Sequence, residues 1–122
     1  MKGVAVLAVE KSQKHLTVFK HNTGLWDFTD QVMALQADFL EMKLDHIKPD
    51  AIIINFKAET IDLLKEKFCL FKHVKPNIRE TLRRASSITN QVVLMLPKHV
   101  EIDEISLVFK DYFEGCHERF FL

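Results

Sequence analysis

Short apolar segments alternate with stretches of helical periodicity along this chain, and this alternation restricts the fold more than any other feature. Four segments are aliphatic or β-branched and too short for buried helices: 4–9, 32–37, 51–55 and 92–96. Helices are predicted at 12–22, 60–68, 77–87 and 103–113. Strands that are apolar throughout are typical of parallel sheets covered by helices on both faces. The sequence therefore predicts an α/β fold, a three-layer sandwich around a mostly parallel sheet.

Polar and flexible residues mark where these elements begin and end. Ser12 is the predicted N-cap of the first helix, and Asn77 is that of the third. Gly24 is predicted to end the first helix, because glycine tolerates the left-handed conformation of a helix stop. Gly115 is predicted to end the last helix, and 116–122 to form a short fifth strand.

Length and composition indicate one globular domain spanning residues 1–122. The net charge is zero, so no global charge draws the chain to nucleic acid or to a membrane. Cys69 and Cys116 lie far apart without metal-ligand spacing, and the histidines show none either, so we expect no metal and an intracellular, reducing compartment. Cytoplasm, nucleus and organelle all stay open. No apolar run approaches the ~20 residues that cross a bilayer.

Basic residues concentrate in the second half of the chain and form the candidate RNA-binding set. Its members are Lys72, Lys75, Arg79, Arg83, Arg84 and Lys98. Such a set can bind RNA phosphates and release their counterions. The alternative is a solvated helix face followed by a solvated loop, which needs no ligand.

Two acidic residues follow the first two predicted strands. Glu10 ends the first strand, where a carboxylate can accept hydrogen bonds from both hydroxyls of a ribose. Asp38 follows the second strand, where it would lie beside an adenine. Taken singly, Glu10 is equally a solvated strand end, and Asp38 is equally a turn-former or a helix cap.

Four short motifs carry a resemblance to a known family. They are AVEK at 8–11, QADF at 36–39, DAIII at 50–54 and ITN at 88–90, the last of them before an apolar strand that ends in Leu-Pro-Lys. In these motifs and their order the chain resembles the RNA cap guanine-N2 methyltransferases, the trimethylguanosine synthases. These are class I S-adenosylmethionine-dependent methyltransferases with a Rossmann-like sheet. The resemblance implies S-adenosylmethionine as cofactor, with Glu10 at its ribose and Asp38 at its adenine.

The chain departs from that family in two motifs. The Gly-rich turn that approaches the methionine end of the cofactor should precede Val4, where only Met1-Lys2-Gly3 is found. The Pro-Pro-aromatic motif that orients and stacks guanine should end the third strand, where Asn55-Phe56-Lys57-Ala58 is found. The resemblance makes Asn55 and Phe56 the catalytic candidates, whereas a core role is the alternative for Phe56.

The absent first strand of the family has a consequence for the sheet. Either another chain fills the gap, or the strands at 4–9 and 51–55 pair directly. Direct pairing gives a reduced, five-stranded sheet in the flavodoxin-like order 2-1-3-4-5, which is our prediction.

Three functional hypotheses follow. The first is a degenerate methyltransferase-like domain that acts through RNA or protein contacts and, alone, binds no cofactor and is not catalytic. The second is half of an RNA cap guanine-N2 methyltransferase that binds S-adenosylmethionine once a partner chain completes it. The third is a flavodoxin-like interaction module. We expect a protein partner or a second copy, with RNA as a further candidate, and neither membrane nor DNA.

Overall fold

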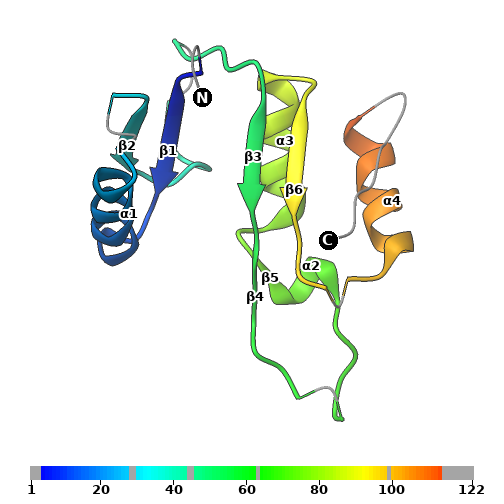
Figure 1. Ribbon diagram of the computed structural model, residues 1–122. Coiled ribbons are helices and arrows are strands. Elements are labelled where there is room, and N and C mark those ends of the chain that lie inside the picture. Colours follow the sequence, from blue (N-terminus) through cyan, green and yellow to red (C-terminus); the bar gives the residue numbers. More distant parts are fainter. Residues whose placement is uncertain (1–3, 28–29, 44–45, 63, 99, 114–122) are drawn as a thin grey trace. The chain divides into compact units, whose positions relative to one another are not determined.

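The computed structural model describes residues 4–27, 30–43, 46–62, 64–98 and 100–113. The chain divides into two compact units, Met1–Leu44 and Asp45–Leu122, called here the N-terminal and the C-terminal unit. Figure 1 labels their helices and strands.

The N-terminal unit is a strand–helix–strand motif. It consists of β1 (Val6–Glu10), α1 (Gln13–Leu25) and β2 (Val32–Gln36). The two strands pair in parallel, with Val6 opposite Val32 and Glu10 opposite Gln36. Leu16 is the buried residue of α1, with 3% of its surface exposed. The predicted parallel arrangement of the first two strands is therefore confirmed.

The first helix begins where the sequence predicts and ends differently. Ser12 is the N-cap, and its Oγ accepts a hydrogen bond from the His15 N–H at 3.4 Å. Gly24 does not end the helix, which continues to Leu25. The left-handed residue is Asp27, with φ 58°. The prediction for Gly24 was wrong because a short polar side chain such as that of Asp also tolerates this conformation.

The C-terminal unit contains two further pairs of strands. The strands are β3 (Ile52–Asn55), β4 (Lys57–Ala58), β5 (Val74–Lys75) and β6 (Val92–Met95). β3 and β6 pair in parallel, whereas β4 and β5 form a short antiparallel ladder. The helices are α2 (Leu70–His73), α3 (Ile78–Ile88) and α4 (Ile102–Tyr112).

Helix α3 supplies much of the core of this unit. Its buried residues Ile78, Thr81, Leu82 and Ala85 recur every three or four positions and so share one face. Asn77 caps the helix as predicted, since its Oδ1 accepts a hydrogen bond from the Glu80 N–H at 3.1 Å. On β3, burial alternates from exposed Ile53 (69%) to buried Ile54 (9%). The two faces of this strand therefore differ in burial.

The predicted helix at 60–68 is absent from the described part of that segment, and this prediction was wrong. Asp62 Oδ1 accepts a hydrogen bond from the Leu64 N–H at 3.0 Å, and the Asp62 carbonyl accepts from Lys65. Such a local side-chain turn competes with helical hydrogen bonds. Leu64 is 98% exposed, and Phe68 instead lies in the core. The helix in this region is the short α2.

Two parallel pairs of strands confirm the α/β class. The predicted five-stranded sheet stays a prediction, and its last strand, at 116–122, lies outside the described residues. Among the residues that the structure describes, no helix has the length and hydropathy needed to cross a membrane.

Candidate functional site

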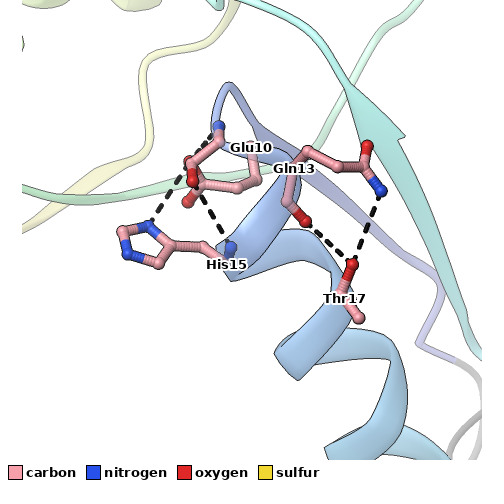
Figure 2. A network of polar contacts seen from close by, with 5 residues as sticks. Glu10, Gln13, His15 and Thr17 are labelled. Atoms are coloured by element: carbon pink, nitrogen blue, oxygen red, sulfur yellow. Dashed lines mark hydrogen bonds and ion pairs between the residues drawn. The ribbon is translucent and has the colours of Figure 1, made fainter.

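Glu10 occupies the carboxyl end of β1 and is held there by the start of α1. Its Oε1 accepts a hydrogen bond from the backbone N–H of Ser12 at 2.8 Å and lies 3.9 Å from Nδ1 of His15 (Figure 2). The side chain is 39% exposed. Glu10 therefore binds an unpaired amide of the helix N-terminus and still faces solvent.

The first turn of α1 carries a second polar contact that fixes its side chains. Thr17 Oγ1 donates to the backbone carbonyl of Gln13 at 2.9 Å, and the Gln13 amide lies 3.5 Å from the same hydroxyl (Figure 2). Both residues are exposed, so this contact adds order rather than burial at the helix start.

The structure brings Asp38 to the same edge as Glu10. The pairing of β1 with β2 continues past the strands, because the Ala37 N–H donates to the Glu10 carbonyl at 3.1 Å. Asp38 is the next residue, and its Oδ2 lies 3.4 Å from Nζ of Lys11. Glu10 and Asp38 therefore lie at the same end of the β1–β2 pair.

Asp38 also forms the turn that follows β2. Its Oδ1 accepts a hydrogen bond from the Leu40 N–H at 2.9 Å, and its carbonyl accepts from Glu41 and Met42. The turn-forming alternative is therefore confirmed. Both carboxylate oxygens are engaged, so an adenine amine would have to displace Lys11 or meet the turn's backbone.

An adenosine fits Glu10 better than it fits Asp38. A ribose offers two hydroxyl donors, and an ionised carboxylate accepts from both of its oxygens. Ser12 occupies one side of Glu10 Oε1 and thereby orients the carboxylate, while Oε2 has no hydrogen bond to any described residue. The S-adenosylmethionine that the resemblance implies would therefore be held here by Glu10, through its ribose.

The two catalytic candidates lie at the end of β3 and differ in burial. Asn55 is exposed, whereas Phe56 is 5% exposed. The Phe56 N–H donates to the Met95 carbonyl at 3.1 Å, which extends the β3–β6 pairing by one residue. The Phe56 ring thus belongs to the core, and stacking on a base would require it to leave that core.

Three of the six candidate RNA-binding residues pair with carboxylates of described residues. Lys72 pairs with Glu66 at 3.1 Å, and Lys75 pairs with Glu59 at 3.2 Å. A third member, Arg79, lies 3.3 Å from Asp111 and stacks over the Phe71 ring at 4.4 Å. Their positive charges are therefore partly neutralised within the unit.

The remaining candidates differ in their surroundings. Arg83 and Lys98 are exposed, and the described residues provide neither with an ion pair. Arg84 is half-buried. Lys57 was missed as a candidate although it directly opposes Lys75 across β4–β5. Its position two residues after Asn55, in place of a motif proline, was the available signal.

His73 is a second site that the sequence analysis missed. It is 2% exposed, and its Nδ1 accepts a hydrogen bond from the Cys69 N–H at 2.8 Å. Its proton therefore lies on Nε2, which is 3.4 Å from Glu66 Oε1 without hydrogen-bond alignment. The hydrogen bond from Lys72, with a smaller contribution from His73, holds the pKa of Glu66 below its ordinary value.

Metal-ligating side chains do not gather in the described part of the chain: no group of three or more His, Cys, Asp or Glu could hold an ion there.

A family model for the RNA cap guanine-N2 methyltransferases matches residues 1–118, which is nearly the whole chain. The match includes both acids at the edge of the N-terminal unit and the segment from β3 through α4. Members of this family use S-adenosylmethionine. The parallel pairs of strands agree with the fold that the family implies. The chain belongs to the RNA cap guanine-N2 methyltransferase family.

Proposed function

We propose that this chain is a methyltransferase-family domain that contacts RNA and does not transfer methyl groups by itself. The observation that carries the proposal is the segment 55–58 after β3, where the family orients and stacks guanine: its aromatic side chain, Phe56, is buried in the core. Asn55 is kept, but Lys57 and Ala58 follow in place of a proline and an aromatic ring. A base bound at this position would contact the side chains of Lys57 and Ala58, and neither of them offers a ring for stacking.

The cofactor side supports the same proposal. Glu10 can hold a ribose, but a ribose is a small part of S-adenosylmethionine, and the glycines of this chain are isolated at Gly3, Gly24 and Gly115. A turn that lets the backbone approach the methionine end needs clustered glycine. We therefore expect no micromolar affinity of these 122 residues for the cofactor.

Calorimetric titration with S-adenosylmethionine and with S-adenosylhomocysteine tests this expectation. A methyl-transfer assay on capped RNA, run with the same protein, tests catalysis directly. We expect no heat of binding at micromolar concentrations and no methyl transfer. Micromolar binding together with turnover would show a working enzyme and end the proposal.

The second candidate is a methyltransferase completed by another polypeptide. The observation that favours it is the retained Glu10 carboxylate, exposed and oriented at the end of β1. Purification from the native source, followed by the same methyl-transfer assay, separates the two candidates. A complex that methylates capped RNA, and loses activity when Glu10→Ala is introduced, would establish the second. The family match removes the argument for a coincidental, flavodoxin-like module.

We also propose that the strands form one sheet in the order β2-β1-β3-β6, with 116–122 as its last strand. This is the order 2-1-3-4-5 that the sequence predicts. Its support is that two of the required neighbours, β1 with β2 and β3 with β6, pair in parallel. In that order β3 is an interior strand, so its amides would exchange with solvent slowly. Fast exchange along the whole of β3 would contradict this order.

A further inference from the structure

The β4–β5 ladder places two lysines directly opposite each other. Lys57 pairs with Lys75, and Ala58 pairs with Val74, so the two ammonium side chains leave the ladder on the same side. Like charges in directly opposite positions destabilise a pair of strands. A ladder of two residues per strand has few other contacts to offset this repulsion. A negative partner would remove it.

Within the described part of the chain, one such partner is found. Glu59 Oε1 lies 3.2 Å from Nζ of Lys75, so that lysine is paired. Lys57 is exposed and has no ion pair or side-chain hydrogen bond with any described residue. Two lysines and one glutamate leave one net positive charge on this ladder. The positive charge that is not paired with a described carboxylate is that of Lys57.

The ladder occupies a position where α/β proteins bind ligands. Phe56 alone separates β3 from β4, so Lys57 follows the carboxyl end of β3. Ligands of parallel sheets bind at the carboxyl ends of the strands. Lys98 follows β6 by three residues, and β6 ends at Met95, the register partner of Asn55. A further lysine thus belongs to the same edge of the β3–β6 pair.

We propose that Lys57 and Lys75 bind phosphate groups of RNA, and that Glu59 is the counter-ion that phosphate displaces from Lys75. This deepens the proposed RNA contact and rests on it. Each ammonium offers three donors, and phosphate oxygens accept charge-assisted hydrogen bonds. A phosphate bound between the two lysines would attract both ammonium groups and so offset their mutual repulsion. The site does not require a bound methyl donor or a stacked base.

Two lysine-to-glutamine variants and one glutamate variant test the site. Binding of a short capped RNA, of its uncapped 5′-triphosphate form and of inorganic tripolyphosphate is followed over a series of salt concentrations. In K57Q/K75Q we expect RNA affinity to fall about tenfold and the salt slope to fall by about 1.4, or about 0.7 per lysine. E59Q should instead bind more tightly, because it removes the competing carboxylate.

The control is K14Q/K20Q, which makes the same change of charge on two exposed lysines of α1. It should leave affinity and slope close to those of the unmodified chain. The thermal midpoint without ligand gives an independent readout. K57Q should be as stable as the unmodified protein or more stable, since it relieves the repulsion. A purely structural role for Lys57 predicts the opposite.

The outcomes separate this site from the proposed function. RNA binding that K57Q/K75Q leaves unchanged, or that falls equally in K14Q/K20Q, overturns the site and leaves RNA contact standing. Weaker binding by E59Q also overturns it. An unmodified chain that binds none of the RNAs overturns both proposals. Tighter binding of tripolyphosphate than of either RNA would assign the lysines to a free polyphosphate and overturn the RNA assignment.

Discussion

The buried imidazole of His73 accepts a hydrogen bond from the backbone N–H of Cys69, at 2.8 Å. The backbone carbonyl of His73 accepts a second hydrogen bond, from the Glu59 N–H at 2.7 Å, next to the β4–β5 ladder. The Phe68 ring lies against it, with centroids 5.5 Å apart. His73, at the end of α2, is thus hydrogen-bonded both to Cys69 before that helix and to Glu59, which directly follows β4. His73 is therefore a structural anchor of the segment between β4 and β5.

Replacing His73 with alanine should lower the free energy of unfolding by about 1–3 kcal/mol, because the Cys69 N–H loses its acceptor and a cavity forms. Urea denaturation measures this change. His21→Ala is the matched control, since His21 is an exposed histidine of α1 and should change stability by less than about 0.5 kcal/mol. Equal effects of the two substitutions would contradict the anchoring role.

Glu66 makes the stability of this region depend on pH. Its pKa lies below the ordinary 4.5, first because Lys72 donates a hydrogen bond to the carboxylate. A carboxyl group with a lowered pKa in the folded state stabilises that state above the ordinary pKa. This contribution is lost as the pH falls through the lowered pKa. Thermal midpoints should therefore fall less between about pH 7 and about pH 3 in Glu66→Gln than in the unmodified chain.

Much of the fold could be predicted from the sequence because local rules agreed with each other. The apolar runs around Val6, Val32, Ile52 and Val92 became strands, and the predicted helix N-caps Ser12 and Asn77 were correct. The prediction of a helix at 60–68 was wrong, although the spacing of its apolar residues was helical. The reason is that Asp62 Oδ1 accepts a hydrogen bond from the backbone N–H of Leu64, two residues later. Periodicity reports which residues can share a face. It does not report a side chain that competes for the same amides.

The candidate site was predictable where it depends on strand ends and unpredictable where it depends on partners. Glu10 and Asp38 follow from the rule that parallel strands end at one edge. The carboxylates that pair with Lys75 and Arg79 are Glu59 and Asp111, which lie far from them in the sequence. Long-range pairs of this kind depend on tertiary packing, so a count of basic residues overestimates the charge available to RNA.

The cap of α3 offers a direct test of local stability. Asn77→Ala should cost about 1 kcal/mol, because the Glu80 N–H loses the Oδ1 that caps it. Asn77→Asp should restore most of this loss, since an aspartate accepts the same bond and suits the positive end of the helix. Chemical denaturation of the two variants gives the comparison. Ser87→Ala, on the exposed face of the same helix, should be nearly neutral.

The core around α3 should respond strongly to lost volume. Leu82 is fully buried, at 0% exposure, so Leu82→Ala should lower the free energy of unfolding by about 2–5 kcal/mol. Leu107 on α4 is 52% exposed, and the same substitution there should cost far less. Comparable losses at both positions, measured by urea denaturation, would show that the packing of this unit differs from that described.

Glu10 has a structural role that must be separated from its proposed contact with a ribose. Glu10→Ala removes the acceptor of the Ser12 N–H and should cost about 1 kcal/mol of stability. Glu10→Gln keeps a carbonyl oxygen for that amide and should cost less, while it removes the charge that ribose hydroxyls would meet. Glu10→Gln is thus the variant in which a loss of ligand affinity reports on the carboxylate itself. If urea denaturation shows Glu10→Ala to be as stable as the unmodified chain, the Ser12 contact contributes nothing and Glu10 is held at this edge by its strand alone.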